Sequence, residues 1–159
     1  MLFGVLTVSD RCSQGLMVDT AGPAVVDLLR QQWPDARIDK TIAPDEEDTI
    51  TARLLEWVSV GAQLILTVGG TGLSPRDRTP EATLHVIDRY VPGLAEAMRA
   101  RGAEKNPYAW LSRGIAGMRG RSLIINLPGS KRAAEESLSA ILDLLRHALD
   151  VAAGGQTHP

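Results

Sequence analysis

A run of glycines between an apolar segment and a proline-initiated helix is the part of this sequence best suited to chemistry. Residues 64–68 are apolar and partly β-branched, which predicts a buried strand. Gly69, Gly70 and Gly72 then surround Thr71. Small residues let the backbone approach a ligand with its N–H groups pointing inward, and such a concavity stabilises anions. The loop therefore predicts a phosphate-binding site.

The polar segment after the glycines carries a carboxylate. Asp77 lies between Arg76 and Arg78, and Thr79-Pro80 predicts a helix start with a hydroxyl at the N-cap and proline at the first helical position. The segment lacks both the Walker pattern and the dinucleotide fingerprint. A tight structural turn is thus an alternative for the glycine loop, and a surface ion pair is an alternative for Asp77.

Composition narrows the class of protein. The chain has 159 residues, which suits one domain with a real core. A net charge of −2 with 23% charged residues indicates no nucleic-acid partner and no acidic membrane surface. The single cysteine, Cys12, excludes a disulfide framework within the chain. With no signal sequence or membrane-spanning run, we expect a cytoplasmic protein.

The hydrophobic pattern alternates between strands and helices. Strands are expected at 2–8, 37–43, 64–68 and 122–127, and the alternation in 37–43 suggests a strand nearer an edge. Helices are expected at 23–33, 50–58, 80–89 and 94–101, with helical turns at 108–118 and a final long helix from 131 to about 153.

Four strands, each followed by helical sequence, predict right-handed parallel crossovers. The expected fold is α/β, a three-layer sandwich with a mostly parallel central sheet and helices on both faces. We expect a single domain at 1–153 and a flexible C-terminal tail at 154–159. The apolar stripe of the final helix and the tryptophans, of which the chain has 3, exceed the apolar surface that one small sheet needs, and this suggests self-association.

A parallel sheet places the carboxyl ends of all its strands along one edge, where ligands bind. Four loops should therefore share one rim: Ser9-Asp10-Arg11, Pro44-Asp45-Glu46, Gly69 to Gly72, and Pro128-Gly129-Ser130.

Two of these rim loops are small-residue anion cradles that precede helices, one around Gly70 and one around Gly129. Asp45 and Asp77 would lie beside phosphates, which they repel unless a cation intervenes. Mg²⁺ resolves this because it binds one or two carboxylates together with substrate phosphate oxygens. Such a site performs phosphoryl or nucleotidyl transfer mainly by positioning and charge stabilisation. As alternatives, Asp45 caps the following helix and Asp10 is a turn residue.

Several sequence blocks then resemble one family. They are Gly69-Gly70-Thr71-Gly72, Ser74-Pro75-Arg76-Asp77, Thr79-Pro80-Glu81-Ala82-Thr83, Val91-Pro92-Gly93, Leu111-Ser112-Arg113 and Asn126-Leu127-Pro128-Gly129-Ser130. Together they resemble the molybdopterin adenylyltransferase family, which includes the G domains of gephyrin and of its plant counterpart. The similarity extends from Thr7 to about Asp150.

The resemblance implies a reaction in which the terminal phosphate of molybdopterin attacks the α-phosphorus of Mg-ATP. The products would be adenylylated molybdopterin, for later molybdate insertion by a separate protein or domain, and pyrophosphate. Asp45 and Asp77 would be the essential carboxylates and the Mg²⁺ ligands. ATP, the co-substrate, would be held by Gly69, Gly70, Thr71, Gly72, Pro128, Gly129 and Ser130. Molybdopterin would be bound by Ser9, Asp10, Arg11, Ser74, Ser112 and Arg113.

The family resemblance also implies a homotrimer and a transient contact with a molybdate-insertion protein. Arg78 stands where the family usually has a small apolar residue, so the electrostatics around Asp77 differ. A sister group with the same fold has a different segment after its Gly-Thr-Gly, and Ser74 to Asp77 fits the adenylyltransferases better. The alternatives are a non-catalytic molybdopterin-binding protein and an oligomerising scaffold.

Overall fold

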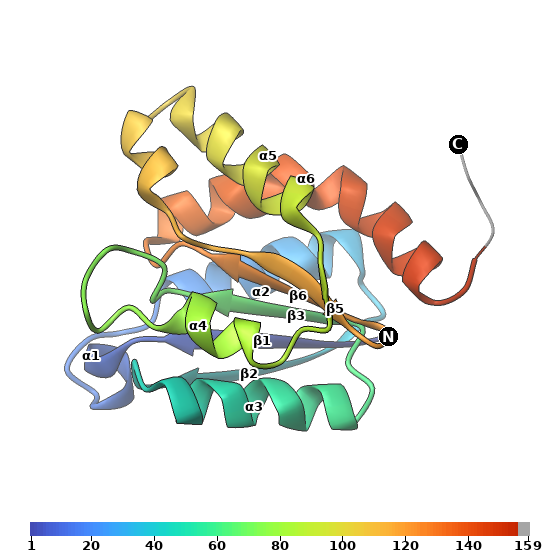
Figure 1. Ribbon diagram of the computed structural model, residues 1–159, viewed down its shortest axis with the longest axis horizontal. Helices are drawn as coiled ribbons and strands as arrows, with labels where there is room; N and C mark the ends of the chain where they lie inside the picture. Colours follow the sequence, from blue (N-terminus) through green and yellow to red (C-terminus); the bar gives the residue numbers. More distant parts are fainter. Residues whose placement is uncertain (156–159) are drawn as a thin grey trace.

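The computed structural model describes residues 1–155 and contains a six-stranded sheet with the order β2-β1-β3-β6-β5-β4 (Figure 1). Residues 156–159, most of the expected tail, lie outside the described residues. The parallel strands are β1 (Leu2–Val8), β2 (Arg37–Ala43), β3 (Leu64–Val68) and β6 (Ser122–Leu127). The expected mostly parallel sheet is confirmed, with β2 at one edge.

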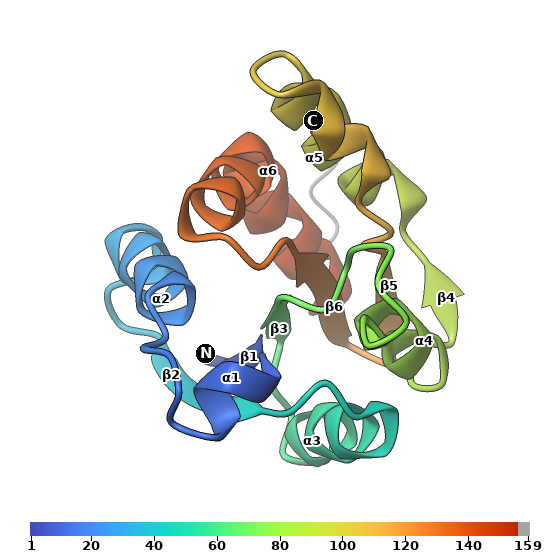
Figure 2. The same ribbon diagram turned by 90° about the vertical axis from the view of Figure 1, so that its left-hand side faces the viewer.

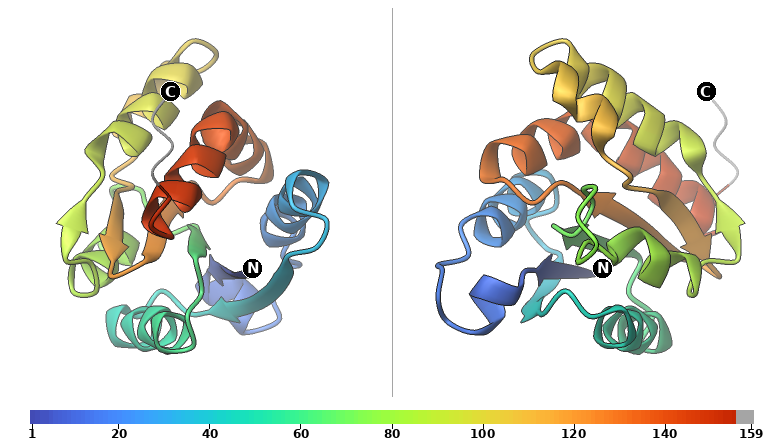
Figure 3. Two further views of the ribbon diagram at one scale, coloured as in Figure 1. Left: turned by 90° about the vertical axis from the view of Figure 1, so that its right-hand side faces the viewer. Right: turned by 60° about the vertical axis from the view of Figure 1, so that its left-hand side comes forward.

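Helices cover both faces of this sheet (Figure 2). One face carries α2 (Ala21–Gln32), α5 (Pro92–Ala103) and α6 (Lys131–Ala152), with α6 between the other two (Figure 3). The other face carries α3 (Glu47–Ser59) and α4 (Thr79–Leu84). The short helices α1 (Asp10–Ser13) and η1 (Pro107–Leu111) lie in loops. The α/β sandwich is therefore confirmed.

The central strands are buried on both faces. In β3, Leu64 and Leu66 pack toward α6, whereas Ile65 between them packs toward α3 and α4. Alternate side chains of a strand point to opposite faces, so a strand between two helical layers is apolar throughout. No helix within residues 1–155 has both the length and the apolar character of a membrane span.

The segment between α4 and β6 differs from the expectation. The helix expected to reach residue 89 ends at Leu84, and β4 (Arg89–Tyr90) follows. The expected helical turns at 108–118 are η1 followed by β5 (Ala116–Arg119), which is antiparallel to both β4 and β6. Gly117 explains the difference, because a Cβ there would lie 2.7 Å from the Arg89 carbonyl oxygen. Glycine is disfavoured in strands by local propensity, but here the missing side chain allows the neighbouring strand β4 to pack closely.

The apolar surface expected to drive self-association is mostly internal. The stripe on α6 is part of the core beneath α2 and α5. Trp33 is 8% exposed and Trp57 is 2% exposed, whereas Trp110 on η1 is 59% exposed. Neither the stripe nor the first two tryptophans therefore offers an interface.

One buried polar side chain connects the two halves of the sheet. Asn126 on β6 donates to the hydroxyls of Thr67 on β3 and Thr83 on α4, each at 2.9 Å. Its Oδ1 accepts the N–H of Ile115 at 3.2 Å. Because buried polar groups are costly when left without partners, these bonds fix α4 and the start of β5 against the central strands.

Asn126→Ala should lower the free energy of unfolding by about 3 kcal/mol, because buried hydroxyls and an N–H lose their partner. Denaturant unfolding measures this. The matched control is Asn106→Ala, which removes an exposed amide that caps η1 by accepting the N–H of Tyr108 and should cost under about 1 kcal/mol. Equal losses in the two variants would contradict a central role for Asn126.

Candidate active site

The carboxyl ends of the parallel strands form one rim, as the topology rule predicts. The N–H of Ser9, just after β1, donates to Ala43 O at the end of β2 at 2.9 Å. The N–H of Gly69, just after β3, donates to Leu127 O at the end of β6 at 3.0 Å. The loops that follow β1, β2, β3 and β6 are thereby held side by side.

The glycine loop on this rim has the backbone conformation of an anion cradle. Gly69 and Gly70 have φ angles of 108° and 65°, which side chains rarely permit. Within residues 1–155, the successive N–H groups of Gly70, Thr71, Gly72 and Leu73 form no hydrogen bond with the protein. Successive unpaired N–H groups in a glycine loop are a preformed site for phosphate oxygens.

A cavity of about 500 Å³ opens beside the glycine loop. Its walls come from that loop, from Pro128 and Gly129 after β6, from Asp77, and from α5, η1 and the start of α6. Of the residues that the sequence nominated, the cavity is lined by Gly70, Thr71, Gly72, Asp77, Ser112, Pro128 and Gly129. The volume lies in the range of small-molecule sites in proteins.

Asp45 lies on the other side of the loop, beside β1. Its Oδ2 accepts the Asp10 N–H and its own N–H donates to Asp10 Oδ1, both at 2.9 Å. It does not cap α3, whose N-cap is Glu46, and so that alternative is wrong. Burial raises the pKa of Asp45 above its ordinary value, and the charges of Asp10 and Asp77 raise it further.

Asp10 and Asp77 are held differently from Asp45. Arg76 donates to both carboxylate oxygens of Asp10 at 2.9–3.0 Å, and the Asp45 N–H and Arg76 lower the pKa of Asp10. Asp77 Oδ2 accepts the Ser74 N–H at 3.1 Å. Arg78 pairs instead with Glu47 at 2.7 Å. Within residues 1–155 neither neighbouring arginine forms an ion pair with Asp77, so the surface ion-pair alternative is wrong.

Each of the two candidate metal ligands lies close to a glycine of the loop. A Cβ at Gly70 would lie 3.2 Å from Asp45 Oδ1, and a Cβ at Gly72 would lie 2.8 Å from Asp77 Oδ2. Within residues 1–155 no group of three or more His, Cys, Asp or Glu side chains forms a metal cluster. Mg²⁺ needs only one or two carboxylates when substrate phosphates supply other ligands. The residues present therefore fit Mg²⁺ held jointly with a phosphate ligand.

Other residues predicted for the site form hydrogen bonds with backbone groups close to them in sequence. Ser9 Oγ accepts the Cys12 N–H and caps α1, and Ser130 Oγ accepts the Ala133 N–H and caps α6, both at 3.2 Å. The Arg11 carbonyl accepts N–H groups of the loop that follows α1. These residues lie on the rim but outside the lining of the cavity.

Thr79 differs from the sequence expectation. It lies inside α4, whose N-cap is Arg78, so the expected N-cap role is wrong. The residue is 0% exposed, and its Oγ1 has no hydrogen-bond partner within residues 1–155. A Cβ at Gly70 would lie 2.2 Å from this hydroxyl. Packing of Thr79 directly behind Gly70 explains why that position requires glycine.

Sequence reasoning missed one wall of the cavity. The lining residues that it did not nominate include Met98, Arg99, Asn106, Tyr108, Glu136 and Ser137. They lie on α5, η1 and α6, which reach the rim only through the packing of three helices on one face. The segment Lys105-Asn106-Pro107 predicted a loop after the preceding helix but gave no indication of a site.

Replacing Asp45 should have a pH-dependent effect on stability. The folded protein binds a proton at Asp45 more tightly than the unfolded chain does, so stability from this group is present at low pH and lost as pH rises through the folded pKa. Asp45→Asn should therefore raise the Tm at pH 7, with the difference from the parent vanishing near pH 3, roughly the acid end of carboxyl titration.

Asp19→Asn is the control of opposite sign. Burial disfavours the Asp19 carboxylate, but Lys40 at 2.7 Å and the Gly22 N–H outweigh it and lower its pKa. Asp19 therefore stabilises the fold above its unfolded pKa, and its replacement should lower the Tm at pH 7. A lower Tm for Asp45→Asn at pH 7 would contradict the raised pKa of Asp45 in the folded protein.

Comparison with known proteins identifies the family of the chain. Residues 4–147 match the family described as "Probable molybdopterin binding domain". The molybdopterin adenylyltransferase of Haemophilus influenzae is 42% identical over 88% of this chain and 72% of its own length. The chain spans only 27% of the molybdenum cofactor synthesis protein cinnamon of Drosophila melanogaster and 22% of the gephyrin of Dictyostelium discoideum, at 40% and 39% identity over 98% and 93% of this chain.

Solved structures share the whole fold. The molybdopterin biosynthesis enzyme MoaB of Thermus thermophilus is 49% identical, with a TM-score of 0.87 over 96% of both chains. A MogA structure is 38% identical, with a TM-score of 0.91 over 96% of this chain and 99% of its own. The extent of these matches, together with the glycine loop and its two carboxylates, shows that the chain belongs to the molybdopterin-binding domain family of molybdenum cofactor biosynthesis.

Proposed function

We propose that this protein is a molybdopterin adenylyltransferase. A terminal phosphate oxygen of molybdopterin attacks the α-phosphorus of ATP, a new P–O–P linkage forms, and the bond to the β-phosphate breaks. The products are adenylylated molybdopterin and pyrophosphate. The leaving pyrophosphate takes the electron pair, so charge develops on phosphate oxygens and the site must stabilise it.

One observation carries the proposal. Within residues 1–155 the four successive N–H groups at residues 70–73 have no hydrogen-bond partner, and these residues line a cavity together with Asp77. Asp45, from the loop after β2, lies on the other side of the glycine loop, where a Cβ at Gly70 would be 3.2 Å from its Oδ1. The N–H groups suit phosphate, whereas carboxylates beside phosphate suit only a site that also takes a cation. Relatives named molybdopterin adenylyltransferase, at 38–42% identity over most of this chain, support the same reaction.

The residues divide into two groups around the glycine loop. Residues 69–72 and 128–130 hold the nucleotide; of these, Gly70, Thr71, Gly72, Pro128 and Gly129 line the cavity. On the β1 side, Ser9, Asp10 and Arg11 meet the molybdopterin phosphate, with Ser74 and Ser112 nearby on the loop and the cavity wall. Asp45 and Asp77 would hold Mg²⁺ together with substrate phosphate oxygens. When bound, Mg²⁺ neutralises charge on the phosphate oxygens.

Burial of Asp45 matches this role. Its ionised form is disfavoured by desolvation and by Asp10 and Asp77, so a cation that binds there relieves repulsion already present in the free protein. Asp10 does not need the cation, because Arg76 compensates its charge. Within residues 1–155 an arginine thus pairs with Asp10, whereas Asp45 and Asp77, the proposed cation ligands, form no ion pair.

We also propose residues 1–153 as one catalytic domain that works as a homotrimer in the cytoplasm, where ATP is available. A transient partner, a molybdate-insertion protein, would receive the product. Exposed apolar side chains on η1 support contact with other chains: Tyr108 is 75%, Trp110 is 59% and Leu111 is 52% exposed.

Incubation of the pure protein with molybdopterin and Mg-ATP tests the function. Mass spectrometry should find adenylylated molybdopterin, and a coupled assay should find equimolar pyrophosphate. Binding of molybdopterin without either product would favour the non-catalytic binding protein. Absence of both binding and turnover would favour the scaffold.

Asp45→Asn and Asp77→Asn should each lower the rate of adenylylation by at least ~100-fold, the scale expected when electrostatic stabilisation of a transfer is removed. Molybdopterin affinity should change little, because other residues hold it. Asp27→Asn, on the exposed face of α2, is the matched control and should keep the parent rate. Parental turnover by either site variant under saturating Mg-ATP would make that residue structural.

Sedimentation at micromolar protein should show a trimer, because the exposed apolar side chains of η1 lose contact with water on assembly. Trp110→Ser should shift the distribution toward monomer, whereas Trp33→Phe, in the core, should leave the assembly unchanged. A monomeric parent protein would refute the proposed assembly.

A further inference from the structure

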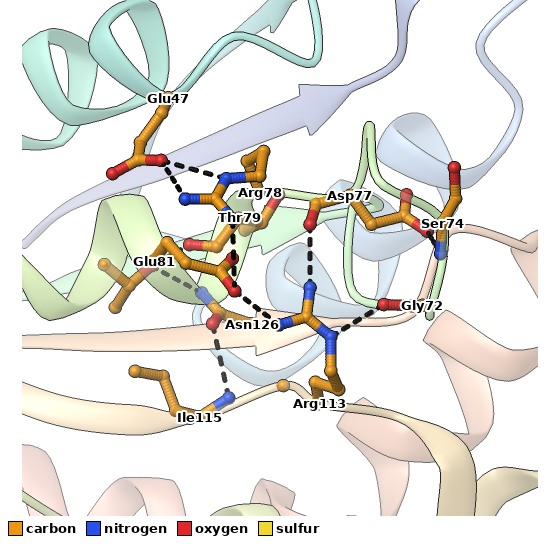
Figure 4. A network of polar contacts seen from close by, with 12 residues as sticks. Glu47, Gly72, Ser74, Asp77, Arg78, Thr79, Glu81, Arg113, Ile115 and Asn126 are labelled. Carbon is orange, nitrogen blue, oxygen red and sulfur yellow. Dashed lines mark hydrogen bonds and ion pairs between the residues drawn. The ribbon is translucent and has the colours of Figure 1, made fainter.

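Arg113 forms hydrogen bonds with the glycine loop, with Asp77 and with Glu81 (Figure 4). Its backbone N–H donates to Thr71 O at 2.8 Å, its Nε to Gly72 O at 2.8 Å and its Nη2 to Asp77 O at 2.7 Å. Its Nη1 donates to Glu81 Oε1 in the first turn of α4. One residue therefore holds both ends of an irregular segment and the helix that follows it.

These contacts determine where the loop N–H groups point. A trans peptide unit is planar, so its N–H points opposite to its C=O. The carbonyls of Thr71 and Gly72 point to Arg113, and consequently the N–H groups of Gly72 and Leu73 point away from it. Gly72 and Leu73 line the cavity, whereas Arg113 does not. Arg113 therefore orients two of the four loop N–H groups that have no hydrogen-bond partner within residues 1–155.

The charge of Arg113 is compensated within the protein. Its side chain is 34% exposed and that of Glu81 is 25% exposed. Burial opposes ionisation of Glu81, but the hydrogen bond from Arg113, a backbone hydrogen bond and the charges of Arg113 and Arg78 together lower the pKa of Glu81. Each of the three guanidinium nitrogens already donates to a protein oxygen. Because three of its five N–H groups are used in this way and Arg113 does not line the cavity, the guanidinium is poorly placed to bind a phosphate there.

We propose that Arg113, held by Glu81, is a positioning residue that presents the glycine-loop N–H groups and Asp77 to the nucleotide phosphates. This assignment differs from the direct molybdopterin contact that the family resemblance implies for Arg113. It rests on the proposed function, because it takes the loop as the site of the nucleotide.

Arg113→Lys tests the proposal, because lysine keeps the charge but cannot form the planar set of hydrogen bonds. Mg-ATP affinity by calorimetry should fall by ~10-fold or more, since small misplacements of positioning groups carry large costs. Molybdopterin affinity should not change. Amide hydrogen exchange in residues 70–77 should become faster, while exchange in the core strands and the Tm stay near the parent values.

Two further variants complete the comparison. Glu81→Gln keeps an acceptor but removes the charge that holds the guanidinium, so it should shift Mg-ATP affinity and loop exchange in the same direction by less. Arg89→Lys is the matched control, because Arg89 likewise pairs with a carboxylate, Asp88, and donates to a carbonyl, Gly120 O, far from the loop. It should leave both readouts unchanged.

Weaker molybdopterin binding by Arg113→Lys, with unchanged Mg-ATP affinity and loop exchange, would overturn the proposal in favour of direct contact. Unchanged binding and exchange would overturn it as well. If Arg113→Lys does not fold, Glu81→Gln decides by the same readouts. If the parent neither binds Mg-ATP nor forms product, the proposed function fails. Loop exchange in Arg113→Lys and Arg89→Lys then still decides whether Arg113 positions the loop.

Discussion

Close backbone packing at Gly69 is the constraint on which the rest of this site depends. A Cβ at Gly69 would lie 2.3 Å from the carbonyl oxygen of Val8 and 3.8 Å from the Cα of Gly129. The ends of β1, β3 and β6 therefore meet backbone to backbone, and no side chain fits between them. This contact joins three separate loops into one continuous surface beside the glycine loop.

Repulsion between carboxylates is the second constraint, and the three carboxylates on the rim are compensated to different extents. Asp10, Asp45 and Asp77 converge on the rim, where like charges repel. Arg76 forms an ion pair with Asp10, and Arg113 forms one with Glu81. Asp45 remains disfavoured in its ionised form. A carboxylate whose pKa is raised by burial and by neighbouring charges is characteristic of functional sites.

Sequence periodicity by itself determined the parallel part of the fold. The strands β1, β3 and β6 are apolar runs bounded by loops, and this pattern has few other solutions in a chain that alternates strands with helices. The rule that parallel strands end at one edge then placed Asp45 beside the glycine loop without any contact information. The rim and its two carboxylates were therefore predictable, because they follow from chain order and strand direction.

Tertiary structure alone decided the rest. A strand of two residues, such as β4, has no periodicity to detect. The glycine at position 117 in β5 is explained only by the close packing of β4 against it. The α5 and η1 wall of the cavity arises from helix packing across the sheet. The side-chain partners of Arg113, two carbonyls and Glu81, come from distant segments, and no local pattern announces them. Side-chain roles depend on such non-local partners, whereas local pattern encodes only which face of an element is buried.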